Sequence, residues 1–79
     1  MQPDKHQKTL EDVKKDIAHN LKKIRLSRNI AQEKLALEAG VDRTFVSKIE
    51  RGLGNPSLEV LLKLANRLDV SLSELLLTS

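Results

Sequence analysis

Apolar residues recur every three or four positions along most of this chain, which is the period of an amphipathic helix. The first series consists of Leu10, Val13, Ile17, Leu21 and Ile24. Thr9, followed by the acidic Glu11 and Asp12, has the character of a helix N-cap, so the series predicts a helix that runs to about Arg28. Residues 1–8 show no apolar period, and we expect them to form a flexible tail.

Two shorter helices are predicted over the middle of the chain. One runs from Gln32 to about Ala39 after a short link. The next runs from Arg43 to Arg51, with Asp42 as its N-cap and Gly52 as its stop.

Two further helices are predicted after a loop over residues 53–56. Ser57 is the expected cap of the fourth, although Asn55 with Pro56 at the first helical position is an alternative. The expected buried stripe of this helix is Leu58, Leu61, Leu62, Ala65 and Leu68. Ser71 and Glu74 have the spacing of a capping box for a last short helix.

Composition favours one compact all-α domain over residues 9–79. A chain of 79 residues buries only about 60% of its unfolded surface, and this one has a single Phe and no Trp or Tyr. Leu, Ile, Val and Ala must therefore build the core, as in a small helical bundle. No apolar run is long enough to span a membrane and no signal peptide is apparent, so we expect a cytoplasmic protein.

Candidate chemistry is sparse. The sequence has no cysteine, and His6 and His19 have no second ligand at a suitable spacing, so no metal site is expected. There is no phosphate-binding glycine loop and no nucleophile with a plausible base. We therefore expect neither an enzyme nor a cofactor or small-molecule ligand.

The spacing of small and apolar residues between Gln32 and Arg51 is typical of a helix-turn-helix. Ala36 is small where a second helix must cross closely, and Gly40 falls at the turn, where a left-handed backbone is expected. Val46 and Ile49 would point beneath the first of the two helices. The side chains left outward on the second helix are Arg43, Thr44, Ser47 and Lys48. These can donate to bases and phosphates, which indicates sequence-specific binding in a major groove of DNA.

The net charge is only +3, but basic residues cluster before and into the first of these two helices. They are Lys14, Lys15, Lys22, Lys23, Arg25, Arg28 and Lys34. A positive flank beside a reading helix is the electrostatic footprint of phosphate contact, whereas a solvated helix face is the alternative for a charge run alone.

The sequence from Gln32 to Gly52, joined to Asn55-Pro56-Ser57 and a leucine-rich helix, resembles the phage repressor and Cro class of helix-turn-helix regulators, also called XRE-like. The resemblance extends from about Ile17 to Leu76 and implies a five-helix, lambda-repressor-like domain with the helix-turn-helix at helices two and three. The opening Asp42-Arg43-Thr44-Phe45 is also similar to controller proteins of restriction-modification systems.

The resemblance implies roles for individual residues. The base-contacting positions are Arg43, Thr44, Ser47 and Lys48, and the phosphate-contacting positions are Gln32, Arg51, Asn55 and Ser57. Arg25 and Glu50 would form a structural ion pair between helices one and three. Phe45 could touch a thymine methyl or a sugar, but we expect it in the core. Many relatives have Ser or Thr where this chain has Ala31, so helix two lacks the usual cap.

The last helix offers more apolar side chains than a short terminal helix needs. We expect Leu72, Leu75, Leu76 and Leu77 to join two copies in a homodimer on a palindromic operator, the alternative being that they close the core of one copy. The predicted function is a DNA-binding transcription regulator, whose partners are duplex DNA and a second copy. A protein-interaction module, such as an antitoxin or a bridging factor, is the alternative.

Overall fold

The computed structural model describes residues 7–77, and within that range it contains five helices and no strand. The helices are α1 (Leu10–Ser27), α2 (Gln32–Ala39), α3 (Arg43–Glu50), α4 (Leu58–Leu68) and α5 (Leu72–Leu76). This architecture confirms the all-α, five-helix prediction, with helix boundaries within a residue or two of those expected. The predicted flexible tail falls largely on residues 1–6, which lie outside the described residues.

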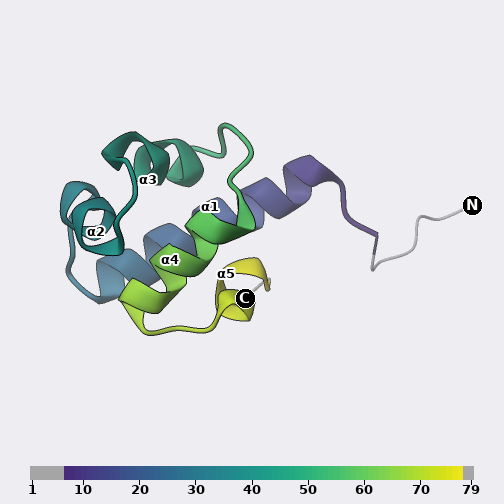
Figure 1. Cartoon of the computed structure of the whole chain (residues 1–79). Coiled ribbons are helices and arrows are strands. Elements are labelled where there is room, and N and C mark those ends of the chain that lie inside the picture. The colour runs from purple at the N-terminus through teal and green to yellow at the C-terminus, as the bar shows by residue number, and fades with distance from the viewer. Residues whose placement is uncertain (1–6, 78–79) are drawn as a thin grey trace, which may run out of the picture.

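Helices α2 and α3 lie together at one end of the molecule, and α5 lies beside α4 near the C-terminus (Figure 1). Helix α3 packs on both α2 and α1, while α5 packs on α1 and α4. Helix α1 therefore contacts both the predicted reading helix and the last helix of the chain.

All five helices contribute to a single apolar core. Its buried members are Ile17, Leu21, Ile30, Leu35, Ala36, Val46, Ile49, Leu61, Leu64, Ala65, Leu68 and Leu75. Val46 and Ile49 are on the inner face of α3, as the helix-turn-helix spacing predicts, whereas Ser47 between them is half-buried and Lys48 is exposed.

The buried face of α4 differs from the predicted stripe. Leu58 and Leu62 are 69% and 47% exposed, whereas Leu64 is fully buried. Residues two positions apart on a helix point about 200° apart, so a face that buries Leu64 leaves Leu62 outside. The expected burial of Leu58 and Leu62 is therefore wrong, and the period alone did not define the rotation of the helix.

Helix starts follow the predicted caps. The Thr9 hydroxyl accepts from the Asp12 N–H, and the Asp12 carboxylate accepts from the Thr9 N–H, which forms a capping box. The Ser57 hydroxyl accepts from the Val60 N–H at 3.1 Å, so Ser57 rather than Asn55 caps α4. The Glu74 carboxylate accepts from the Ser71 N–H at the start of α5.

The turn between α2 and α3 has the left-handed residue that the sequence predicts. Gly40 has φ +76°, and its N–H donates to the last turn of α2. The Val41 N–H donates to the Ala36 carbonyl at 3.0 Å. A Cβ built on Gly40 would meet no atom within 4 Å, so the backbone conformation, not lack of space, favours glycine here.

Candidate nucleic-acid interface

The outer face of α3 carries polar side chains above two buried apolar ones. Val46 and Ile49 are 0% and 4% exposed and fix the inner face of the helix. The four residues predicted to meet bases share the other side: Arg43, Thr44 and Lys48 are exposed and Ser47 is half-buried. The structure thus leaves the first two turns of α3 accessible to a ligand outside the domain.

The start of α3 is organised by Asp42. Its carboxylate accepts from the Thr44 N–H and from the Thr44 hydroxyl, each at 2.8 Å. The backbone hydrogen bond from Thr44, followed by the side-chain one, lowers the pKa of Asp42. Since the hydroxyl hydrogen of Thr44 is engaged, this side chain presents its methyl group and oxygen lone pairs to a ligand.

Arg43 pairs with Glu33 across the turn. The distance from Arg43 Nη1 to Glu33 Oε1 is 2.8 Å, and the two side chains are 73% and 75% exposed. An ion pair this exposed contributes about 1 kcal/mol or less and is weakened by salt. Arg43 is therefore readily available to a stronger partner such as a guanine edge or a phosphate.

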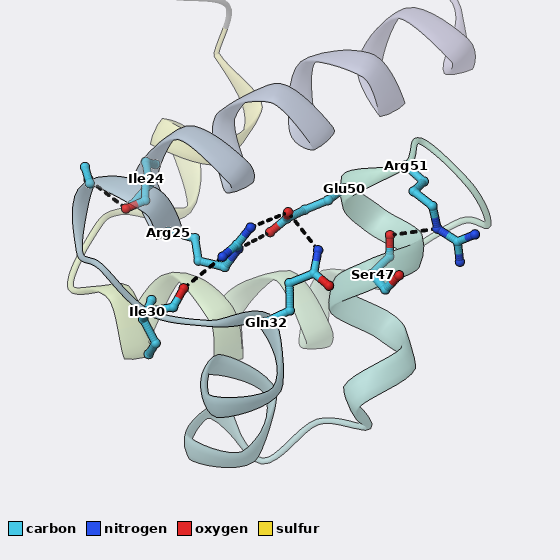
Figure 2. Close-up of polar contacts among 8 residues, drawn as sticks. Ile24, Arg25, Ile30, Gln32, Ser47, Glu50 and Arg51 are labelled. Carbon is cyan, nitrogen blue, oxygen red and sulfur yellow. Dashed lines mark hydrogen bonds and ion pairs between the residues drawn. The ribbon is translucent and has the colours of Figure 1, made fainter.

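A polar network beneath the exposed face ties α3 to α1 (Figure 2). Glu50 accepts from Arg25 Nε at 2.6 Å and from Arg25 Nη2 at 3.0 Å. Arg25 Nη1 donates to the Ile30 carbonyl at 2.9 Å, in the link before α2. The hydrogen bond to Glu50 raises the pKa of Arg25 despite the opposing effect of burial. Arg25 and Glu50, which the resemblance pairs, are thus joined in bidentate geometry.

Gln32 belongs to the same network. Its side-chain nitrogen donates to Glu50 Oε1 at 3.0 Å. A primary amide carries two hydrogens, so Gln32 retains one donor for a phosphate while Glu50 holds the other. The preceding residue, Ala31, has the extended backbone of an N-cap but no side-chain cap, so the N–H groups of the first turn of α2 lack that acceptor.

The remaining predicted phosphate contacts follow α3. Arg51 is exposed at the C-cap of α3, where its Nε donates to the Ser47 carbonyl at 3.3 Å (Figure 2). Asn55 is exposed in the loop, and Ser57 is exposed with its oxygen occupied as an N-cap acceptor. Ser57 can still donate its hydroxyl hydrogen.

Phe45 was expected in the core, and that prediction is wrong. Its side chain is 43% exposed on α3. With Lys48, it lines a groove of about 140 Å³ that is completed by Ile49 and the loop. Val46 and Ile49 already fill the space beneath α3, and the residue before Val46 is turned about 100° away from it. The position of Phe45 around the helix was therefore the signal that it lies outside the core. The expectation of burial gave more weight to its being the one aromatic residue of the chain.

The cluster of basic residues divides between structure and surface. Arg25 is 8% exposed and pairs with Glu50. Arg28 donates to the Leu68 carbonyl at 3.1 Å, at the end of α4, and Lys14 lies 3.5 Å from Glu11. The other members, Lys15, Lys22, Lys23 and Lys34, are exposed. Among the described residues, no group of His, Asp and Glu side chains has the arrangement of a metal site.

The predicted dimer residues of the last helix differ in exposure. Leu75 is fully buried in the domain's own core, so it has no surface to offer a second copy. The prediction that Leu75 contributes to the dimer surface is therefore wrong. This residue instead closes the core of its own domain, as the alternative expected. Leu72 and Leu76 are half-buried against the core, and Leu77 is 64% exposed. None of the helices described is long and apolar enough to cross a bilayer.

The sequences of two curated relatives align with most of this chain. A hypothetical transcription factor from Neisseria meningitidis serogroup B is 37% identical over 67 residues, which cover 85% of this chain and 63% of that protein. Control protein C.BamHI from Bacillus amyloliquefaciens is 46% identical over 57 residues, which cover 71% of this chain and 70% of the relative. The chain thus spans somewhat less than two thirds of the Neisseria protein.

A solved structure and a family model agree with these relatives. The structure of SinR, described as the master regulator for biofilm formation in complex with DNA, has a TM-score of 0.72 and 39% identity. It covers 76% of this chain, which in turn covers 97% of that one. Residues 21–75, which span α2 and α3, match the helix-turn-helix family model HTH_3. The chain therefore belongs to this helix-turn-helix family of DNA-binding transcriptional regulators.

Proposed function

We propose that this protein binds a palindromic operator as a homodimer and reads each half-site with α3 in the major groove. The main support for the proposal is that α3 has one buried, anchored face and one exposed, polar face. One side is fixed by Val46, Ile49 and the hydrogen bonds of Glu50, while the other presents arginine, threonine, serine and lysine side chains.

The proposed base contacts are Arg43, Thr44, Ser47 and Lys48. Arg43 or Lys48 would pair with guanine in the major groove, and the Thr44 methyl group would meet a thymine methyl. The hydrogen bond from the Thr44 hydroxyl to Asp42 supports the second role, because it turns the polar hydrogen of this side chain toward the protein.

The proposed phosphate contacts are Gln32, Arg51, Asn55 and Ser57. They lie at the start of α2, at the end of α3 and in the segment before α4. Each retains at least one hydrogen-bond donor. Because phosphates carry little sequence information, these four residues would orient the domain and contribute affinity to every duplex.

A single reading helix covers a short sequence, and two copies on DNA place their helices about 34 Å apart, one helical turn. We propose that Leu72, Leu76 and Leu77 supply the apolar contact between copies. In support, Leu77 is largely exposed beside the two half-buried residues, although α5 also packs on its own domain.

Selection of binding sites from random duplexes tests the proposal. A specific dimer returns an inverted repeat, which it binds at least about a thousandfold more tightly than random DNA. Arg43→Ala should relax the preference at one position, by about 1–3 kcal/mol. Gln32→Ala should weaken all sequences alike. Selection without enrichment, together with capture of a stoichiometric protein partner, would instead support the interaction-module alternative.

A further inference from the structure

A buried amide on α1 holds the C-terminal end of the described chain. Asn20 is 4% exposed, and its side-chain nitrogen donates to the Leu75 carbonyl at 2.9 Å and to the Leu77 carbonyl at 2.5 Å. Both hydrogens of the amide are therefore used, and the two acceptors are 55 and 57 positions away in sequence.

These hydrogen bonds meet a specific need of α5. The helix spans only Leu72–Leu76, which is too short to be stable by itself in water. The last carbonyls of any helix lack partners within the helix. Asn20 satisfies the Leu75 carbonyl in the last turn of α5 and the Leu77 carbonyl just after it, where the backbone is extended. It thereby fixes both the end of α5 and the direction in which the chain leaves it.

Packing alone does not require an amide at this position. A buried polar group is costly unless its hydrogen bonds are made, and an apolar residue could fill the space among Ile17, Leu21 and their neighbours. Asn20 and Arg25 are the only buried polar or charged residues among those described. Both lie on α1: Arg25 fixes α3 through Glu50, and Asn20 fixes α5.

We propose that Asn20 is a positioning residue for operator recognition: by holding α5 on α1, it sets the geometry of the dimer and hence the spacing between the two reading helices. This inference rests on the homodimer proposed above. In such a dimer, α1 is the rigid connection between the surface that reads DNA and the surface that meets the second copy. If α5 could move relative to α1, the contact at Leu77 would no longer fix the distance between the two α3 helices.

Two substitutions of Asn20 remove the hydrogen bonds in different ways. Asn20→Leu keeps the branching and the number of heavy atoms of the side chain but has no donor, and Asn20→Asp places a carboxylate beside two carbonyl oxygens. Ile30→Val is the control, because Ile30 is buried in the link between α1 and α2 and lies outside α5. Circular dichroism identifies a temperature at which all proteins are folded, and sedimentation equilibrium and site selection are then performed at that temperature.

We expect each Asn20 variant to raise the dimer dissociation constant by about tenfold, since the partner must order α5 on binding. Selection from duplexes with two half-sites at variable separation should return a narrow spacing for the unaltered protein and a broad one for both variants. Base preference within each half-site should not change. Ile30→Val should lower the melting temperature without altering dimer affinity or spacing.

The Asn20→Asp variant provides a second, pH-dependent readout. Burial beside two carbonyl oxygens raises the pKa of the new carboxyl group, because both effects disfavour its charged form. As the pH falls below that pKa, the protonated group regains one O–H donor and dimer affinity should partly recover. The unaltered protein and Asn20→Leu lack this group, so they serve as references at each pH.

Two results would overturn the inference in distinguishable ways. If the unaltered protein dimerises and both Asn20 variants retain its affinity within about twofold and its spacing preference, Asn20 has no positioning role. If the unaltered protein stays monomeric in solution and on DNA, the homodimer itself is refuted, and this inference with it.

Discussion

Removal of the Glu50 carboxylate tests how α3 is held in position. Glu50 accepts three hydrogen bonds, two from Arg25 and one from Gln32. The Arg25 and Glu50 side chains are 10% and 3% exposed. Glu50→Ala would therefore leave a nearly buried guanidinium with only the Ile30 carbonyl as its partner.

Breaking a buried ion pair by removing one partner costs about 3–5 kcal/mol, because the remaining charge is uncompensated. Since Arg25 keeps one acceptor, we expect the lower end, about 3 kcal/mol. For a domain of this size, that loss corresponds to a fall in melting temperature of about 12–24 °C. It is also a large part of the total stability of a small domain, which is about 5–15 kcal/mol.

Thermal and urea denaturation, followed by circular dichroism, measure this loss. Glu59→Ala is the matched control, because Glu59 is 78% exposed and pairs with Lys63 at 3.3 Å, so its removal should cost less than about 1 kcal/mol. DNA affinity, measured where both variants are folded, should also fall for Glu50→Ala because α3 and Gln32 lose a shared anchor.

Removal of both charges should restore stability. Arg25→Met combined with Glu50→Leu removes both charges, and replacement of a buried ion pair by apolar residues is often neutral for stability. The double variant should therefore recover most of the loss seen in Glu50→Ala. If Glu50→Ala melts no lower than Glu59→Ala, the hydrogen bonds of Glu50 with Arg25 and Gln32 do not stabilise the domain.

Three further predictions concern the backbone around α2 and α3. Ala31→Ser should stabilise the protein by about 0.5–2 kcal/mol in urea denaturation, because Ala31 already has N-cap backbone geometry without a side-chain acceptor. If the free energy of unfolding does not rise, Ala31 is not the N-cap of α2. Gly40→Ala should cost about 1–2 kcal/mol through its positive φ alone, and Gly40→Asn should cost less since Asn tolerates that conformation; equal losses would contradict the backbone explanation. The lowered pKa of Asp42 adds stability that is fully present above the ordinary pKa of an aspartate and is lost as pH falls through the lower pKa of the folded protein. In acid melting curves, Asp42→Asn, which caps comparably but does not titrate, should therefore lose less stability than the unaltered protein; parallel curves would refute this.

Local signals predicted the helices well because each boundary depends on neighbouring residues. Thr9 and Ser57 cap helices through hydrogen bonds to positions three residues later, and Gly40 adopts the left-handed conformation of the turn. These interactions need no knowledge of the rest of the fold. They explain why the order and type of the elements could be predicted from the sequence.

The orientation of side chains around each helix was harder to predict. Leu62 and Leu64 are equally apolar, and only the packing of α4 on other helices decides which of them is buried. Phe45 is displaced from the core because Val46 and Ile49 already fill it, and Leu75 is buried by contacts of α5 with α1 and α4. Apolar character shows that a residue can be buried, whereas burial itself is decided by the surrounding helices.

The most informative residue that sequence reasoning missed is Asn20, and the reason is physical. Its partners are backbone carbonyls, which every residue possesses, so no complementary side chain in the sequence marks the contact. The Arg25–Glu50 pair could be anticipated because both partners carry opposite charges and a known resemblance relates their positions. The one signal present in the sequence is an amide at an apolar position of the helical period, three residues after Ile17 and four before Ile24. Because α1 carries both that amide and Arg25, the hydrogen bonds that stabilise the monomer also fix α3 relative to α5, which is what the proposed recognition of two half-sites requires.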